Sequence, residues 1–146
     1  GPGESYSDSK QANRFGIYNC RVDDLYTPYV RPQENGNRTD TKWAAFTDIR
    51  GMGLIAAGMP KFDFSAHWFT TQDLDKASHT YELIKRGFIT LNLDYQQHGL
   101  GTASCGPGQL PQYRLLPHEF NFRLRLTPFS KDAISDIELG KRIIMD

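Results

Sequence analysis

The sequence predicts a mainly β domain, folded as an antiparallel β-sandwich. Several segments alternate apolar and polar residues with a period of two, which places one face of each strand in a core and the other in solvent. Helical periodicity is scarce, and 13 glycines and 8 prolines in 146 residues supply frequent turns. This length suits one domain, because single cores usually span about 100–200 residues.

Six segments carry the strand signals. The clearest alternation lies in Lys61–Phe69, Gly87–Tyr95 and Glu119–Thr127. In the first of these, Phe62 shares its face with apolar residues and Asp63 shares the opposite face with polar ones. Shorter segments rich in aromatic and aliphatic residues are also predicted as strands, because such residues pack well on a pleated surface: Arg14–Val22, Lys42–Ile49 and Leu54–Ala57.

Turn signals separate these segments. Asn35-Gly36 is the strongest of them, because both residues tolerate a positive φ. Gly51-Met52-Gly53 and Met59-Pro60 are predicted as further turns. Asn35 and Arg38 are expected to fix the first turn and its partners rather than to bind a ligand.

One short helix and one long loop complete the prediction. The helix is expected at Thr71–Ser78, where Thr70 or Thr71 can cap it and Asp73 lies near the positive end of its dipole. Gly99–Pro111 is rich in glycine and proline, lacks periodicity, and is predicted to be a loop of functional importance.

Composition excludes several classes of protein. Lys plus Arg and Asp plus Glu both number 17, so the net charge is zero, which argues against a sequence-independent nucleic-acid binder. No apolar run approaches the roughly 20 residues of a membrane span, so no membrane partner is expected. The two cysteines, Cys20 and Cys105, cannot form a disulfide framework.

The chemistry-bearing residues point to no site by spacing alone. The four histidines lack the compact spacing of metal ligands, so no metal site is expected. Cys105 lies in no recognisable nucleophile motif. Paired carboxylates are the machinery of glycosidases, but the sequence does not show which of the candidates would meet across one bond. These candidates are Glu34, Asp40, Asp94 and Glu119.

A series of short motifs, however, resembles the C-terminal domain of glycoside hydrolase family 2 β-galactosidases. The N-terminal motif reads Gly-Pro-x-Glu-x-Tyr-x-Asp, from Gly1 to Asp8. The resemblance keeps its order and approximate spacing over about residues 1–127, and the tail 128–146 lies beyond it. The other matching segments are Asp24–Val30, Pro32–Arg38, Phe62–Ser65, Ala77–His79, Leu91–Asp94 and Gly99-Leu100-Gly101.

The resemblance implies a fold for this chain, and it implies that other domains of the enzyme carry the catalytic residues. The fold is part of a galactose-mutarotase-like supersandwich, of which residues 1–127 would be the C-terminal half. The catalytic glutamates of such enzymes lie on an upstream barrel, so this chain is expected to hold no catalytic residue and to be inactive alone. No cofactor is expected in this chain, and any Mg or Na ions of the parent enzyme would be bound by other domains. The glutamates that inherit no catalytic role are Glu4, Glu34, Glu82, Glu119 and Glu138.

The same resemblance identifies the loop after Gly99-Leu100-Gly101 as a wall of the substrate pocket. Where related enzymes carry a Trp beside the aglycone, this chain has Cys105, or Gly106 in an alternative alignment with the shorter loop. Cys105, Ser104 and His98 are therefore the candidate substrate-binding residues on the aglycone side. The opposing hypotheses are that the loop is reorganised and Cys105 touches no sugar, and that His98 packs on a neighbouring loop.

Two other classes of function stay open. One is a non-catalytic carbohydrate-binding sandwich that stacks sugars on Trp43, Trp68 or tyrosines, and the other is a structural or oligomer-forming domain. The expected partners are a galactoside bound by the parent enzyme, the remaining domains of the same polypeptide, and further copies in a homo-oligomer. The sequence leaves the compartment open between cytoplasm and periplasm.

Overall fold

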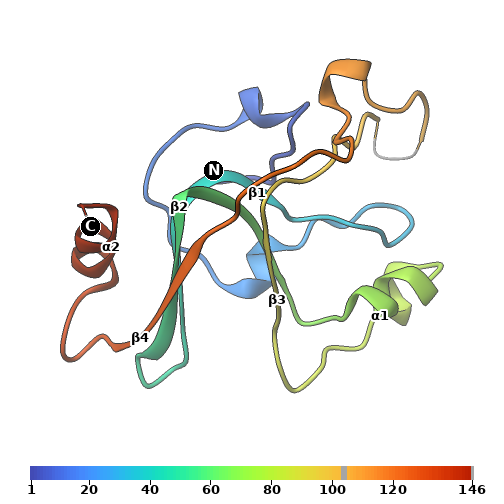
Figure 1. Ribbon diagram of the computed structural model, residues 1–146. Coiled ribbons are helices and arrows are strands. Elements are labelled where there is room, and N and C mark those ends of the chain that lie inside the picture. The colour runs from blue at the N-terminus through green and yellow to red at the C-terminus, as the bar shows by residue number, and fades with distance from the viewer. Residues whose placement is uncertain (103–104, 146) are drawn as a thin grey trace. The chain divides into compact units, whose positions relative to one another are not determined.

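The structure is a computed structural model that describes residues 1–102 and 105–145. Four strands form one sheet in the order β1-β2-β3, and β4 also pairs with β2 (Figure 1). The strands are β1 (Arg38–Thr47), β2 (Met52–His67), β3 (Thr90–Asp94) and β4 (Leu124–Ser130). The helices are α1 (Thr71–Lys76), α2 (Asp136–Met145) and the 3₁₀ turns η1 (Lys10–Ala12), η2 (Val22–Leu25), η3 (Thr80–Glu82) and η4 (Pro111–Tyr113). The mainly β class is confirmed, as a single antiparallel sheet in the described part of the chain.

The chain divides into two compact units, and the long strand β2 contributes to both. The first unit comprises residues 1–39 and 63–116, and the second comprises residues 40–62 and 117–146. Each unit buries its own set of apolar side chains. The set in the first unit is Tyr6, Leu25, Ala66, Phe69, Leu74 and Ala77, and the set in the second is Ala44, Ile55, Ala56, Ala57, Phe62 and Phe129.

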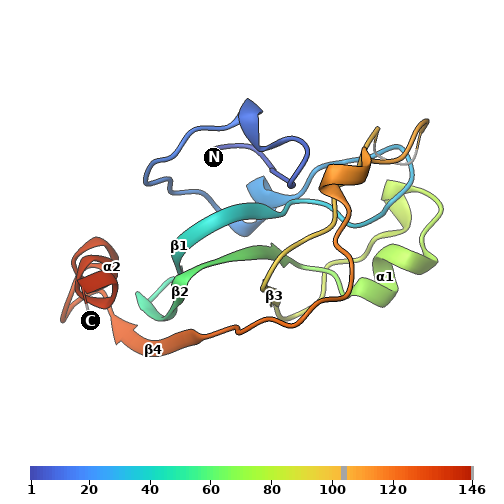
Figure 2. The ribbon, with the colours of Figure 1, turned by 45° about the horizontal axis from the view of Figure 1, so that its top comes forward.

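In the second unit, a tight turn joins β1 to β2. The Asp48 carboxylate accepts hydrogen bonds from the backbone N–H groups of Arg50 and Met52, each at 2.9 Å. Gly51 follows with a φ of 78°, a conformation that glycine adopts at little cost. The turn therefore lies at Asp48–Gly51, earlier than the predicted Gly51-Met52-Gly53, because Met52 and Gly53 already belong to β2. Such a short connection makes β1 and β2 antiparallel neighbours, as Figure 2 shows.

The tail 128–146 carried no structural prediction, and its described residues form the end of β4 and the helix α2. β4 pairs antiparallel with the first half of β2, from Met52 opposite Ser130 to Gly58 opposite Leu124. The helix α2 follows, and the Ser135 hydroxyl accepts a hydrogen bond from an N–H group in its first turn.

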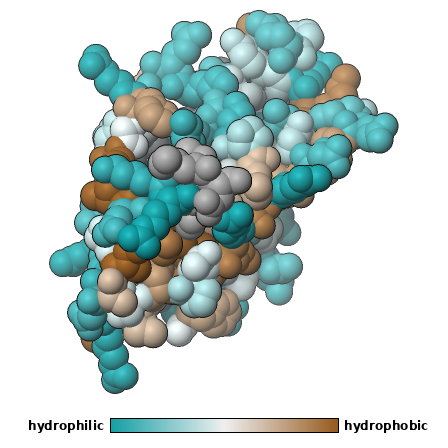
Figure 3. All heavy atoms as spheres, turned by 60° about the vertical axis from the view of Figure 1, so that its left-hand side comes forward, coloured by the Kyte–Doolittle hydropathy of each residue, from teal (hydrophilic) through white to brown (hydrophobic). Residues whose placement is uncertain are grey.

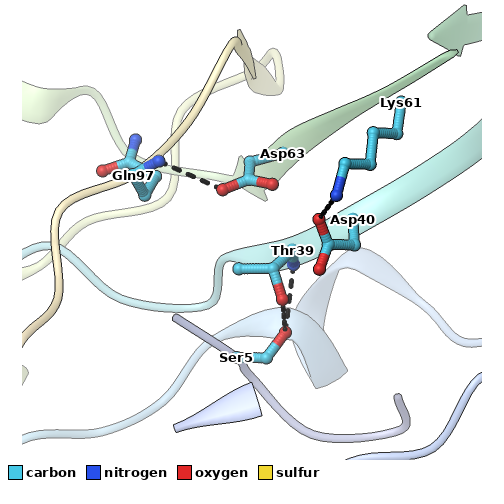
Figure 4. A network of polar contacts seen from close by, with 6 residues as sticks. All are labelled: Ser5, Thr39, Asp40, Lys61, Asp63 and Gln97. Carbon is cyan, nitrogen blue, oxygen red and sulfur yellow. Dashed lines mark hydrogen bonds and ion pairs between the residues drawn. The ribbon is translucent and has the colours of Figure 1, made fainter. Parts of the chain in front are cut away.

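In the first unit, β3 pairs antiparallel with the second half of β2, and the polar face of β2 is buried there. Asp63, Ser65 and His67 share this face, and each has at most 6% of its surface exposed. The sequence predicted a solvated polar face, and that prediction is wrong, because partners within the same unit bind Asp63, Ser65 and the Nε2 of His67. The Asp63 carboxylate accepts from the Gln97 N–H group at 3.1 Å (Figure 4), and the Ser65 hydroxyl accepts from the Asn92 amide at 3.0 Å.

The remaining predictions of strands, turns and a helix are confirmed only in part. Four predicted strands overlap β1, β2 and β3, although three of them extend past the observed ends. The helix begins at Thr71 with Thr70 as its cap, as expected, and ends at Lys76 instead of Ser78. Met59-Pro60 lies inside β2 instead of forming a turn, and Arg14–Val22 is irregular up to the start of η2. The strand predicted at Glu119–Thr127 begins only at Leu124. Neither α-helix in the described ranges is long and apolar enough to cross a membrane.

Candidate functional site

The candidate site is the long segment after β3, from His98 to Tyr113, in the first unit. Its two limbs meet where the Gly99 N–H group donates to the Tyr113 carbonyl oxygen at 3.3 Å. Nearer the tip, both the N–H group and the hydroxyl of Thr102 donate to the Pro107 carbonyl, at 3.3 and 3.0 Å. The segment is thus a closed loop with an exposed tip, as the glycine and proline content predicted.

His98 faces the returning limb of this loop. Its Nδ1 accepts a hydrogen bond from the Leu115 N–H group at 3.0 Å, and its Nε2 contacts the side-chain amide of Gln109. Both ring nitrogens are therefore occupied by the loop itself. This geometry favours the hypothesis that His98 packs within the loop over the hypothesis that it donates to a sugar.

Cys105 lies at the exposed tip of the loop. Its backbone N–H group donates to the Thr102 carbonyl at 3.2 Å, and its thiol is free of any disulfide. Gly106, the alternative match to the family's Trp, is exposed beside it. Ser104, the remaining predicted residue, lies outside the described residues. The structure thus brings His98 and Cys105 onto one loop, one at its base and one at its tip.

Sequence reasoning assigned no role to Asp8, although the structure brings it to this loop. The Asp8 carboxylate accepts hydrogen bonds from the backbone N–H groups of Leu100, at 3.3 Å, and Gly101, at 2.6 Å. Asp8 precedes these residues by more than 90 positions, so local spacing could not indicate the contact. Its one signal was its place at the end of the matching N-terminal motif.

The candidate carboxylates of the first unit are each held by a protein group. The Tyr6 hydroxyl donates to Glu34 at 3.3 Å, and the Gln97 amide donates to Asp94 at 2.9 Å. Burial raises the pKa of Glu34, and the negative charge of Asp94 raises it further. Glu34 is therefore a carboxyl group that resists ionisation inside this unit.

The other candidate carboxylates belong to the second unit. Asp40 forms an ion pair with Lys61 (Figure 4), and Glu119 is exposed. In the described ranges, His, Cys, Asp and Glu side chains form no group of three or more that could hold a metal ion.

A separate small pocket of about 80 Å³ opens elsewhere in the first unit. Its walls include Tyr26, His67, Trp68 and Lys85, and neither His98 nor Cys105, the described residues predicted on the aglycone side, lines it. The Nε2 of His67 contacts the Asn35 carbonyl oxygen at 2.9 Å, and burial lowers the pKa of this imidazole. Trp68 is half-buried, with its indole nitrogen enclosed, so it does not form the exposed stacking platform that the carbohydrate-binding hypothesis requires.

These features define a class of protein: a β-rich domain that presents a long, internally bonded loop. The family model described as Beta galactosidase small chain matches residues 1–126. The chain belongs to this family.

Curated relatives agree with this assignment. The chain is 39% identical over 128 residues to a β-galactosidase of Kluyveromyces lactis, and the match covers 86% of the chain but 12% of that protein. A β-galactosidase of Pseudoalteromonas haloplanktis is 37% identical over 128 residues, and one of Actinobacillus pleuropneumoniae is 33% identical over 126 residues. Each match covers 12% of the relative's length, so the chain spans about an eighth of these relatives.

Proposed function

We propose that this chain is the part of a β-galactosidase that lines the aglycone side of the substrate pocket, and that cleavage is carried out elsewhere in the polypeptide. Membership of the Beta galactosidase small chain family carries this proposal, since the relatives are β-galactosidases about eight times as long as the match. Retaining hydrolysis needs two carboxyl groups about 5–5.5 Å apart. We assign that pair, and any Mg or Na ions, to other domains.

The sheet of this chain would then be part of a larger two-sheet sandwich. Large apolar side chains are exposed in both units, among them Val30 at 90% and Ile49 at 104%. Brown apolar residues also reach the surface between teal ones on the face drawn in Figure 3. Such exposure fits a domain that other parts of a polypeptide, or further copies in a homo-oligomer, would cover.

The exposed tip of the loop is the part that would meet the aglycone. Cys105 presents a small thiol where the resembling enzymes present an indole, whose contact with a ring is worth about 1 kcal/mol beyond area burial. The aglycone subsite of this enzyme is therefore wider on this side, and it favours larger galactosides than an indole-walled subsite would.

The test restores the indole in the complete polypeptide. In the Cys105→Trp variant, we expect kcat/KM for a short aryl galactoside to rise about fivefold relative to kcat/KM for a longer galactoside. Gly106→Trp is the matched control, since it adds the same indole at the neighbouring exposed position and tests the alternative alignment.

Two results would contradict the proposal. One is an unchanged ratio of the two kcat/KM values in both tryptophan variants. The other is measurable galactoside hydrolysis by the purified 146-residue chain alone, since this would place the catalytic carboxylates within it.

A further inference from the structure

The loop that carries Cys105 is fixed at its base by one carboxylate from a distant part of the chain. The two carboxylate oxygens of Asp8 accept hydrogen bonds from two successive backbone N–H groups. Oδ1 accepts from Leu100 at 3.3 Å, and Oδ2 accepts from Gly101 at 2.6 Å. Hydrogen bonds to an ionised acceptor are roughly twice as strong as neutral ones. We propose that Asp8 is a positioning residue, which sets where the loop tip stands in the pocket wall without touching the substrate.

The two glycines of Gly99-Leu100-Gly101 make this contact possible. A Cβ on Gly99 would lie 2.8 Å from Asp8 Oδ2, so a side chain at this position would push the carboxylate away from its present place. Gly101 has a φ of 61°, and a Cβ there would lie 2.6 Å from the carbonyl carbon of Gly108. One glycine therefore makes room for Asp8, and the other makes room for the returning limb of the loop.

The residue before Asp8 holds the opposite limb. The Ser7 hydroxyl donates to the Tyr113 carbonyl oxygen at 3.4 Å, and the Gly99 N–H group donates to the same oxygen. The N-terminal segment thus contacts both limbs of the loop within two successive residues. Beyond Gly101, Thr102 bonds back to Pro107, so the direction of the tip follows from its base.

This inference rests on the proposed function, because Asp8 can position the loop tip against a substrate only if the loop lines the substrate pocket. It adds a consequence of its own: loss of the Asp8 carboxylate would displace the aglycone wall while leaving the galactose side intact. Selectivity between aglycones would then change more than the overall rate. Loss of fold alone would lower the kcat/KM of every galactoside by the same factor.

The first measurement tests, in this chain, the hydrogen bonds that the Leu100 and Gly101 amides donate to Asp8. In Asp8→Ala, we expect hydrogen exchange at the Leu100 and Gly101 amides to accelerate about tenfold or more, with Asp8→Asn intermediate because its amide keeps one acceptor oxygen. Asp23→Ala is the matched control, since it removes an exposed carboxylate that pairs with Lys85 and binds no loop amide. Unchanged exchange at both amides in Asp8→Ala would overturn the inference.

The second measurement uses the complete polypeptide. In Asp8→Ala, we expect the ratio of kcat/KM for a disaccharide galactoside to that for methyl β-galactoside to change at least about threefold, with Asp8→Asn again intermediate. An equal loss for both substrates would overturn the positioning role.

The Cys105→Trp variant separates the two possible failures. If that variant changes selectivity and Asp8→Ala does not, the loop lines the pocket and the inference about Asp8 is wrong. If neither variant changes selectivity although exchange accelerates in Asp8→Ala, the proposed function fails and the positioning role fails with it.

Discussion

Asn35 and Gly36 are buried in an irregular segment of the first unit, directly before β1. The Asn35 side chain accepts a hydrogen bond from the Thr27 N–H group at 2.9 Å and donates to the Gln33 carbonyl at 2.8 Å. Gly36 has the positive φ, 72°, that the sequence predicted, and its N–H group donates to the Glu4 carboxylate at 2.8 Å. Asn35 therefore fixes the local backbone, but the hairpin turn predicted at Asn35-Gly36 is wrong, because the segment leads into β1 and no strand precedes it in the described ranges.

Gly36 is the residue of this segment least able to accept a side chain. A Cβ there would lie 2.4 Å from the Leu25 carbonyl oxygen and 2.9 Å from the His67 ring, on a backbone that L-residues rarely adopt. We expect Gly36→Ala to lower the free energy of unfolding by about 2 kcal/mol or more. Urea unfolding measures this loss. Gly87→Ala is the control, since a Cβ at Gly87 would meet nothing within 4 Å and the change should alter stability by less than about 0.5 kcal/mol.

His67 gives the first unit a dependence on pH. Burial is the main cause that lowers the pKa of His67 below its ordinary value, so the folded chain holds this imidazole neutral. The unfolded chain takes up a proton at about pH 6.5. Because the unfolded state then binds more protons, the contribution of His67 to stability is present above that pH and is lost as the pH falls toward the lower folded pKa.

His67→Gln tests this dependence. We expect the variant to be less stable than the parent chain at about pH 7.5 and to lose less stability on acidification to about pH 5, since glutamine does not titrate. Urea unfolding at both pH values measures the two differences. The exposed His118→Gln should retain the parent's pH dependence, and an equally steep dependence in His67→Gln would assign it to other groups.

At the scale of elements, α1 is the part most completely specified by local sequence. The Thr70 hydroxyl accepts from the Asp73 N–H group at 3.1 Å, and the Asp73 carboxylate accepts from the Thr70 N–H group at 2.9 Å. Asp73 also pairs with the Arg86 guanidinium, which is the largest cause that holds the pKa of this carboxyl below its usual range. The helix is short, so its stability depends on this cap and on Leu74, its buried residue.

The cap predicts the effect of removing its hydroxyl. Thr70→Ala should lower the free energy of unfolding by about 1 kcal/mol, because the Asp73 N–H group loses its acceptor. Thr71→Ala removes the same atoms one position later, where the side chain is exposed and the structure assigns it no capping bond, and should cost less than about 0.5 kcal/mol. Urea unfolding of both variants measures the difference. Equal losses in the two variants would show that the cap does not stabilise this helix.

The strands show how far a local pattern can predict this fold. β1, β3 and both halves of β2 follow from composition and alternation, because these segments find neighbouring strands. Arg14–Val22 has the same composition, yet it joins no strand in the described ranges and leaves Phe15 83% exposed. Strand propensity reflects how well a segment packs against a neighbouring strand, and a single sequence does not show which segment that neighbour is. For the same reason, alternation placed the start of β4 at Glu119, ahead of its start at Leu124, which is set by the pairing of Leu124 with Gly58.

The candidate site shows the same limit over a longer distance. The loop and its glycines were visible in the sequence, and the resemblance indicated that the loop belongs to a pocket wall. The contact of Asp8 with Leu100 and Gly101 joins residues more than 90 positions apart, so it follows only from the folded chain. The buried polar face of β2 was missed because alternation predicts which residues share a face, and not whether that face is covered.

At the scale of the whole molecule, the main feature is the set of exposed apolar side chains, which a free-standing domain would bury. They occur in both units, with Phe15 and Ile84 in the first and Ile49 and Met52 in the second among the most exposed. Large apolar patches on folded proteins usually mark surfaces that another chain or domain covers. The relatives extend well beyond the matched region, which supplies candidate covering segments.

This exposure predicts how the chain behaves when it is purified alone. The chain should enhance the fluorescence of an apolar dye such as anilinonaphthalene sulfonate while its near-ultraviolet circular dichroism still reports ordered aromatic residues, which distinguishes a folded domain with exposed apolar surface from a molten globule. When the domains that precede the matched region in the complete polypeptide are included, the dye bound to this region should fall, because they cover the exposed side chains. A longer polypeptide that binds as much dye at this region would contradict the proposal that the sheet is part of a larger sandwich. Loss of the aromatic dichroism in the isolated chain, regained in the longer one, would instead show that the covering segments are needed for its packing.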